Sequence, residues 1–164
     1  MRRFSTVARL PSLLNLKVGK IIQCDFHPDA DKLYVSKINV GTDELQVCSG
    51  LVNYIDRSKL LNKDVVLLTN LKPSKMRGVL SQAMVLATES TDGSVVELIN
   101  PPKDASIGDQ LYFGGAVEKD PPRLKSKVWQ EIQAHLFTNG NGEAVFKTDD
   151  EELVLKRENG TAPA

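Results

Sequence analysis

The segment from residue 70 to residue 84 combines cationic side chains with conformationally restricted residues between two apolar runs. Lys72, Lys75 and Arg77 can each contact a phosphate, and a guanidinium can also stack on a base or bind two oxygen atoms. Pro73 fixes its own φ and restricts the residue before it to extended geometry, so the segment loses less entropy on binding. This stretch is therefore the first candidate for a polyanion site.

Neutral polar residues and a glycine complete the same segment. Asn70, Ser81 and Gln82 offer hydrogen-bond donors and acceptors suited to a base edge or a 2′-hydroxyl. Gly78 supplies either a positive φ or a close approach of the backbone. The pattern is only moderately specific, because many surface turns are basic.

Charge is unevenly distributed, although the formal net charge is zero. Residues 57–82 carry six cationic side chains against one acid, Asp64, whereas residues 85–112 carry five acids against one cation, Lys103. If folding gathers the cations on one face, that face can steer an anionic partner despite overall neutrality. The alternative is an ordinary solvated surface.

The run His-Pro-Asp-Ala-Asp-Lys at residues 27–32 could suggest acid–base or metal chemistry. Its proline and aspartates favour a turn that aims Lys32 outward. His135 is the only other histidine and no cysteine cluster exists, so we expect no metal site. Ser49 lacks the surroundings of a nucleophile. We predict no cofactor and no enzyme activity, since the carboxylates near His27 give a catalytic site only weak support.

Base-stacking side chains are scarce. Phe26, Tyr34 and Tyr54 are the main aromatic candidates, and Met76 and Met84 could also pack against a base. For each of them the apolar character favours a place in the core.

The chain has 164 residues, which is about one average domain, with 41% hydrophobic and 26% charged residues. It contains no apolar run near the roughly 20 residues that span a bilayer, so we expect no membrane segment. Cys24 and Cys48 lie in apolar, strand-like runs, and we interpret them as reduced core residues rather than a disulfide.

The N-terminal residues 1–15 are rich in arginine and hydroxyl residues and contain no acid. This composition is typical of a mitochondrial transit peptide, although Pro11 limits any amphipathic helix to about ten residues. An unstructured basic tail that adds phosphate contacts is an equal alternative. The protein is thus expected to be cytoplasmic or mitochondrial.

From Leu16 onward the pattern is β-like. The strand at 64–70 is almost continuously apolar, which indicates burial on both faces. Many short strands with one brief helix at 53–62 indicate a small, closed or partly closed β-barrel, with a sandwich as the second choice. The expected strands cover residues 16–26, 33–40, 45–48, 64–70, 82–87, 95–99 and 110–113, with a hairpin turn at 91–93.

Residues 123–137 form an expected helix whose apolar face has a spacing of four residues. Residues 144–146 and 153–155 resemble two short strands. Because a helix and a hairpin cannot support a core of their own, they must dock on the barrel. We expect disorder from Arg157 to the C-terminus.

Three motifs carry a family resemblance: residues 27–34 (HPDADKLY), 48–52 (CSGLV) and 70–84 (NLKPSKMRGVLSQAM). In this order and spacing they closely resemble the tRNA-binding OB-fold domain. That domain occurs in some methionyl- and tyrosyl-tRNA synthetases, in endothelial monocyte-activating polypeptide II, and in the fungal cofactor of methionyl- and glutamyl-tRNA synthetases. Residues 125–133 resemble the Lys-rich, Trp-containing helix of its longer subfamily.

The resemblance implies an all-β-dominated fold, a five-stranded OB-fold barrel with a C-terminal helix-plus-hairpin extension packed on it. The expected division is a basic N-terminal segment at 1–15, the OB-fold domain at 16–115, the extension at 116–157 and a disordered tail at 158–164. In the longer subfamily the extension covers a face that shorter relatives use to dimerise, so the resemblance implies a monomer.

The function that the resemblance implies is structure-selective, largely sequence-independent binding of tRNA, as a delivery module or cofactor for an aminoacyl-tRNA synthetase. The alternative is a protein-binding domain, chaperone-like or cytokine-like, without essential RNA binding. The predicted RNA contacts are Lys32, Asn70, Lys72, Lys75, Arg77, Ser81 and Gln82.

Overall fold

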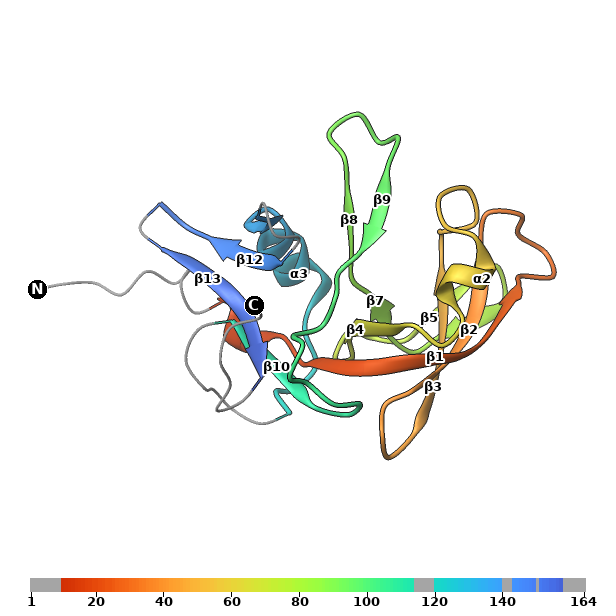
Figure 1. Ribbon diagram of the computed structural model, residues 1–164, viewed down its shortest axis with the longest axis horizontal. Helices are drawn as coiled ribbons and strands as arrows, with labels where there is room; N and C mark the ends of the chain where they lie inside the picture. The colour runs from red at the N-terminus through yellow and green to blue at the C-terminus, as the bar shows by residue number, and fades with distance from the viewer. Residues whose placement is uncertain (1–9, 114–119, 140–142, 150, 158–164) are drawn as a thin grey trace, which may run out of the picture.

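The computed structural model describes residues 10–113, 120–139, 143–149 and 151–157 (Figure 1). Strands dominate these residues, which confirms the all-β prediction. The elements, in chain order, are η1 (Leu10–Leu13), β1 (Leu16–Phe26), β2 (Tyr34–Asn39), β3 (Glu44–Ser49), α2 (Arg57–Leu60), β4 (Asp64–Leu68), β5 (Ser74–Met76), β6 (Val79–Ser81), β7 (Met84–Val85), β8 (Ala87–Glu89), β9 (Val96–Leu98), β10 (Gln110–Phe113), α3 (Ser126–Gln133), β11 (Leu136–Thr138), β12 (Ala144–Lys147) and β13 (Glu152–Arg157).

The long strand β1 organises the sheet. Its first half pairs antiparallel with β4 and β10, and its second half pairs with β2, which continues to β3. The register shifts between Ile21 and Gln23, and such an irregularity bends a strand and increases its twist. At Gly19 a Cβ atom would lie 2.6 Å from Cγ2 of Ile38 on the paired strand β2, so a larger residue here would force its neighbours to shift. This curled, antiparallel arrangement agrees with the predicted OB-like fold.

Strand β4 lies between two cores, as its apolar run predicted. Val65 and Leu67 belong to a cluster inside the barrel, together with Tyr34 and Ile38. Val66 and Leu68 belong to a second cluster on the opposite side. Successive side chains of a strand point to opposite faces, so an uninterrupted apolar run fills both clusters.

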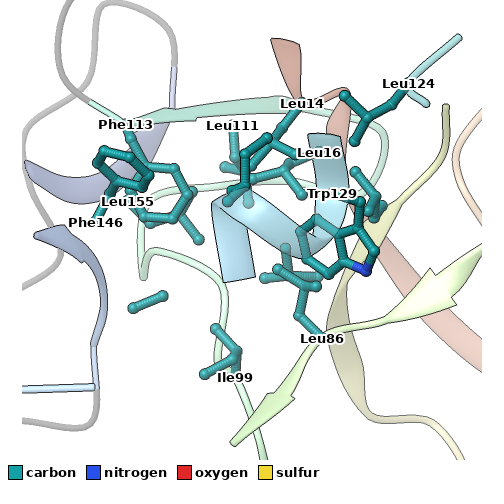
Figure 2. Close-up of a cluster of buried hydrophobic side chains, with 14 of the residues drawn as sticks. Leu14, Leu16, Leu86, Ile99, Leu111, Phe113, Leu124, Trp129, Phe146 and Leu155 are labelled. Atoms are coloured by element: carbon teal, nitrogen blue, oxygen red, sulfur yellow. The ribbon is translucent and has the colours of Figure 1, made fainter. Parts of the chain in front are cut away.

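The second cluster joins the barrel to the C-terminal extension (Figure 2). Leu16 and Leu111 come from barrel strands, whereas Trp129, Phe146 and Leu155 come from α3, β12 and β13. Strand β13 also pairs antiparallel with β10, so the extension continues the same sheet. This arrangement confirms that the extension packs on the barrel.

Several elements differ from the sequence prediction. The helix expected at 53–62 is limited to α2, and the basic segment between the strands expected at 64–70 and 82–87 forms two strands of its own, β5 and β6. The helix expected at 123–137 ends at Gln133, because Leu136–Thr138 forms a strand that pairs with β12. The strand expected at 82–87 is divided between β7, which pairs with β4, and β8, which pairs with β9. Arg157, expected to be disordered, ends β13 and pairs with Leu111. In the last three cases pairing with another strand overrides the local pattern.

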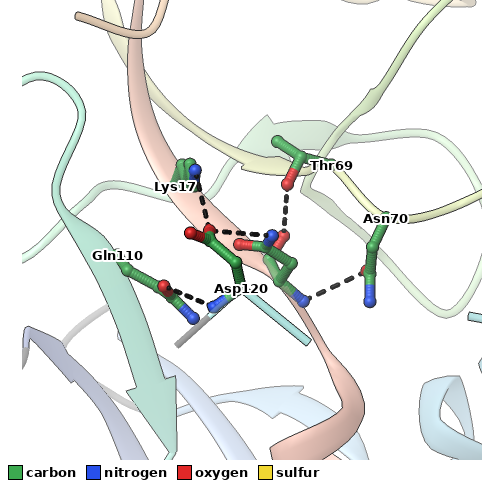
Figure 3. Close-up of polar contacts among 6 residues, drawn as sticks. Lys17, Thr69, Asn70, Gln110 and Asp120 are labelled. Atoms are coloured by element: carbon green, nitrogen blue, oxygen red, sulfur yellow. Dashed lines mark hydrogen bonds and ion pairs between the residues drawn. The ribbon is translucent and has the colours of Figure 1, made fainter. Parts of the chain in front are cut away.

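Residues 10–15 also pack against the folded body, although the expected N-terminal segment 1–15 included them. Leu14 is buried in the second cluster, and the backbone carbonyl of Asn15 accepts hydrogen bonds from the backbone N–H and the hydroxyl of Thr69. Asp120 accepts a bond from the Asn15 amide and forms an ion pair with Lys17 at 3.0 Å (Figure 3). Residues 1–9, which carry most of the transit-peptide pattern, lie outside the described residues.

Two further features concern single residues and long helices. Cys24 and Cys48 are both buried and unpaired, as predicted. Within the described ranges, no helix combines the length and apolar character needed to cross a bilayer.

Candidate nucleic-acid interface

The cationic segment folds into a tight hairpin, in which β5 pairs with β6 and Arg77 and Gly78 form the turn. Their φ angles are +51° and +87°, the sign pattern of a type I′ turn, whose twist matches that of the flanking strands. A Cβ atom at Gly78 would meet nothing within 4 Å, so glycine serves the positive φ here and not a close approach. The turn places the Arg77 side chain at the tip.

His27 holds one side of this hairpin. Its ring is only 5% exposed, and Nε2 lies 2.9 Å from the carbonyl oxygen of Met76. The backbone N–H of Asp29 donates to Nδ1 at 2.9 Å, so Nδ1 is an acceptor and the ring proton is on Nε2. Arg77 adds a bond from Nη2 to the carbonyl oxygen of Asp29 at 3.2 Å. The turn at 27–32 is therefore tied to the cationic hairpin.

Ser81 and Gln82 hold the other side of the hairpin against β3. The buried Ser81 hydroxyl accepts a hydrogen bond from the backbone N–H of Cys48 at 2.9 Å and donates to the carbonyl oxygen of Ala83. The side-chain oxygen of Gln82 accepts from the backbone N–H of Gln46 at 2.8 Å, and the backbone N–H of Gln82 donates to the Gln46 carbonyl. Side chains thus complete the hydrogen bonding between β3 and the hairpin.

Asn70 is buried, and its side-chain amide binds the protein's own backbone. It is 8% exposed, and its amide oxygen accepts a bond from the backbone N–H of Asn15 at 3.1 Å (Figure 3). Its amide nitrogen donates to the carbonyl oxygens of Leu13 and Pro122, each at 2.8 Å. Asn70 therefore fastens the N-terminal segment and the start of the extension to the barrel.

The four predicted cationic contacts remain on the surface. Lys32, Lys72, Lys75 and Arg77 are all exposed. Lys75 pairs with Leu80 across the hairpin, and alternation along the strand puts it on the face opposite Ser74 and Met76. Positive charge is thus presented at the tip of the hairpin and beside it.

An open groove of about 270 Å³ lies between the hairpin and the end of β3. It brings residues 48–51 of the second sequence motif against the third motif. The third motif contributes Lys72, Ser74, Met76 and residues 81–84. Apolar side chains therefore lie among hydroxyl, amide and ammonium groups, as in a site that holds a base and its backbone. Met84, expected in the core, is 37% exposed along this groove.

The aromatic candidates also separate. Tyr34 is 2% exposed and donates a hydrogen bond from its hydroxyl to the carbonyl oxygen of Ile55, so its placement in the core is confirmed. Phe26 and Tyr54 are exposed, and the expectation that they belong to the core is wrong. Phe26 is the last residue of β1 and Tyr54 lies in the turn between β3 and α2, and neither belongs to the barrel cluster.

Sequence reasoning missed His27 and the structural roles of Ser81 and Asn70. The bonds of these residues reach partners 49, 33 and up to 57 positions away, and no local pattern reveals such pairs. In the part of the chain that the structure describes, no three His, Cys, Asp or Glu side chains gather as metal ligands would.

Comparison with known proteins agrees with this geometry. A family model described as a putative tRNA binding domain matches residues 16–110. The cytoplasmic methionine–tRNA ligase of Arabidopsis thaliana is 47% identical over 146 residues, which are 87% of this chain and 18% of that protein. The tRNA-aminoacylation cofactor arc1 of Schizosaccharomyces pombe is 44% identical over 136 residues, 80% of this chain and 30% of that protein.

Among solved structures, the C-terminal domain of Plasmodium vivax p43 superposes with a TM-score of 0.73 at 31% identity and covers 92% of this chain and 96% of that one. A CsaA chaperone from Picrophilus torridus has a TM-score of 0.56 at 25% identity and covers 65% of this chain and 98% of that one. The chain spans less than half the length of the two curated relatives named above. With its three motifs gathered around one hairpin and the family model spanning the barrel, the chain belongs to the tRNA-binding domain family.

Proposed function

We propose that this protein binds tRNA through shape and charge, with little base specificity, and presents it to an aminoacyl-tRNA synthetase. The observation that carries the proposal is a cationic hairpin held on both sides by hydrogen bonds, in a chain of the tRNA-binding domain family. A rigid hairpin loses little entropy on binding, so its charges can be used for phosphate contacts.

Lys32, Lys72, Lys75 and Arg77 are the proposed phosphate contacts, because all four are exposed around the hairpin. Gln82 is a proposed neutral contact, since it lines the groove. We give Asn70 and Ser81 a positioning role instead, because they are buried and their polar atoms bind the protein's own backbone. Residues 16–115 would then bind RNA, and residues 116–157 would complete the fold.

The proposal is tested by measuring tRNA affinity over a salt series for wild type and for an Arg77→Asn, Lys75→Gln double variant. Asparagine tolerates the positive φ of position 77, so the turn is kept while the charge is removed. Two lost phosphate contacts should reduce the magnitude of the slope of log K against log salt by about 1.4 to 1.8. Lys103→Gln, an exposed lysine in another loop, is the control and should leave affinity and slope unchanged. A double variant that binds like wild type would refute the site, and a wild type without tRNA affinity would refute the function.

Polypeptide binding is the second candidate, favoured by the structural likeness to a protein described as a chaperone. Size-exclusion chromatography with and without tRNA, followed by an aggregation-suppression assay on an unfolded protein, separates the two candidates. If the protein does not co-elute with tRNA but suppresses aggregation of the unfolded protein at an equal concentration, polypeptide binding is supported over tRNA binding.

Further proposals concern the assembly and the place of action. We propose that the protein is a monomer, because β13 pairs along β10 and α3 covers the second cluster. The extension would then occupy the face through which shorter relatives are expected to dimerise. Light scattering tests the monomeric state. We propose that the cationic hairpin and its groove serve binding rather than catalysis.

Curated relatives are named as cytoplasmic, and we propose that the protein acts in the cytoplasm or in mitochondria. Imaging of a fluorescent fusion with and without residues 1–15 decides between the two.

A further inference from the structure

Phe26 is an exposed aromatic ring next to a guanidinium. It is the last residue of β1, and 57% of it is exposed. The guanidinium carbon of Arg57 lies 5.3 Å from the ring centroid, and the ring of Tyr34 packs against its side at 5.4 Å and 44°. A cation over a ring is a favourable pair, and Tyr34 limits the movement of the ring. Arg57 lies over one face of the ring, so Phe26 and Arg57 form a stacked pair at the surface, which we call the Phe26 platform.

An open hollow of about 610 Å³ adjoins this platform. Exposed apolar side chains, Ile22 and Leu61, line part of it, and the carboxylates of Asp25 and Asp56 line another part. Hydrogen bonds from Ser58 hold the pKa of Asp56 below its usual value, so this group is charged at neutral pH. Two carboxylates disfavour a phosphate in the hollow but can accept hydrogen bonds from base amino groups.

The Phe26 platform lies close to the proposed phosphate contacts. Phe26 pairs with Tyr34 across the sheet, and Tyr34 pairs with Ser49, which lines the groove beside the hairpin. Two strand spacings separate Phe26 from Ser49, roughly 10 Å. The next residue, His27, binds the hairpin itself. A strand of RNA bound at the hairpin can therefore bring a neighbouring base to Phe26.

We propose that Phe26 and Arg57 stack an unpaired base of the bound tRNA; this inference rests on the proposed function. A base presents an apolar face to the ring and polar edges to the carboxylates, which matches the mixed lining of the hollow. An apolar protein segment would instead remove water from Arg57, Asp25 and Asp56 without replacing their hydrogen bonds, and this cost favours the base.

The test compares tRNA affinity at one fixed salt concentration for wild type, Phe26→Leu and Phe26→Trp. Leucine keeps apolar bulk but removes the aromatic face, and tRNA binding should weaken about 5- to 150-fold, the loss that follows from removing one base–aromatic stack. Tryptophan keeps an aromatic face and should bind tRNA at least as well as wild type. The salt slope should be the same for all three proteins, because no phosphate contact is changed.

Phe137→Leu is the matched control. Phe137 is also an exposed phenylalanine, at 50%, with a cation near its ring, Lys147 at 5.6 Å, but it lies on β11 in the extension. Its substitution should leave tRNA affinity unchanged.

Equal tRNA affinity of Phe26→Leu and wild type, while the Arg77→Asn, Lys75→Gln variant binds weakly, would overturn this inference and leave the proposed function standing. An equal loss in Phe26→Leu and Phe137→Leu would also overturn it, since the effect would not depend on the platform. A wild type that does not bind tRNA would overturn both proposals.

Discussion

The hydrogen bonds of His27 lead to the sharpest prediction, because each ring nitrogen has a different partner. Asparagine at this position offers an oxygen near the place of Nδ1 and can keep the bond from the backbone N–H of Asp29. Glutamine offers an amide N–H near the place of Nε2 and can keep the bond to the carbonyl oxygen of Met76. The two substitutions therefore test which bond positions the hairpin.

The magnitude follows from the bonds that are lost. His27 is almost fully buried, so loss of one bond leaves a partly buried partner unsatisfied and costs about 1 to 2 kcal/mol, and His27→Ala costs about 2 to 4 kcal/mol. The hairpin is in equilibrium between a form docked on His27, which binds tRNA, and an undocked form. Where the docked form is the minor one, destabilising it by about 1.4 kcal/mol lowers its population about tenfold. The apparent tRNA affinity falls by the same factor.

Two assays check this reasoning. Urea unfolding gives the stability loss, and amide hydrogen exchange of Val79, whose strand pairs with Met76, reports whether the hairpin opens. We expect faster exchange and about tenfold weaker tRNA binding for His27→Asn and His27→Ala, and near wild-type values for His27→Gln. If the Val79 amide of the His27→Ala variant exchanges at the wild-type rate, and the variant binds tRNA with wild-type affinity, His27 does not position the hairpin.

Three other predictions concern stability and ionisation. Asn70→Ala removes three side-chain hydrogen bonds and should lower the free energy of unfolding by about 2 to 4 kcal/mol in a urea titration, and an unchanged midpoint would contradict the fastening role. Hydrogen bonds from Ser90 and Ser94 lower the pKa of Asp92 to about 2 from 3.8, so the β8–β9 turn is stabilised above pH 3.8 and loses that support as the pH falls towards 2. Chemical shifts of the turn amides should move over that interval and stay constant above it. Burial raises the pKa of Cys24 and of Cys48 above 9.0, so iodoacetamide at pH 8 should alkylate them slowly in the native protein and rapidly in urea; fast native labelling would show that the thiols are accessible.

Much of the β-structure could be predicted because its signals are local. The nearly continuous apolar run at 64–70 indicated a strand buried on both faces, and the two clusters show the alternation that produces it. Gly78 indicated a special backbone position in the basic segment, and its φ of +87° forms the hairpin turn. Residue type and spacing are sufficient for such elements, since strand alternation and turn geometry depend on neighbouring residues.

The structure places the predicted site residues in two groups: the cationic side chains are exposed, whereas Asn70 and Ser81 are buried. Ser81 and Asn70 have the polar groups that a base-contacting residue needs, and they lie in the same sequence motif as Lys75. They are buried because Cys48 and Leu13 approach them from distant parts of the chain. Burial and hydrogen-bond partners depend on these long-range contacts, so a motif can mark positions without separating those that touch a ligand from those that hold the site in place.

Sequence patterns therefore specified the β-rich fold, the buried strand β4, the exposed cationic segment and the family of this protein. Only the folded chain shows that His27 binds the hairpin and that the buried Asn70 joins the N-terminal segment to the extension. It also shows that Phe26 is exposed beside Arg57. The physical reason is range: periodicity and turn chemistry act over a few residues, whereas exposure and hydrogen-bond partners are set by segments about fifty residues apart that meet only after folding.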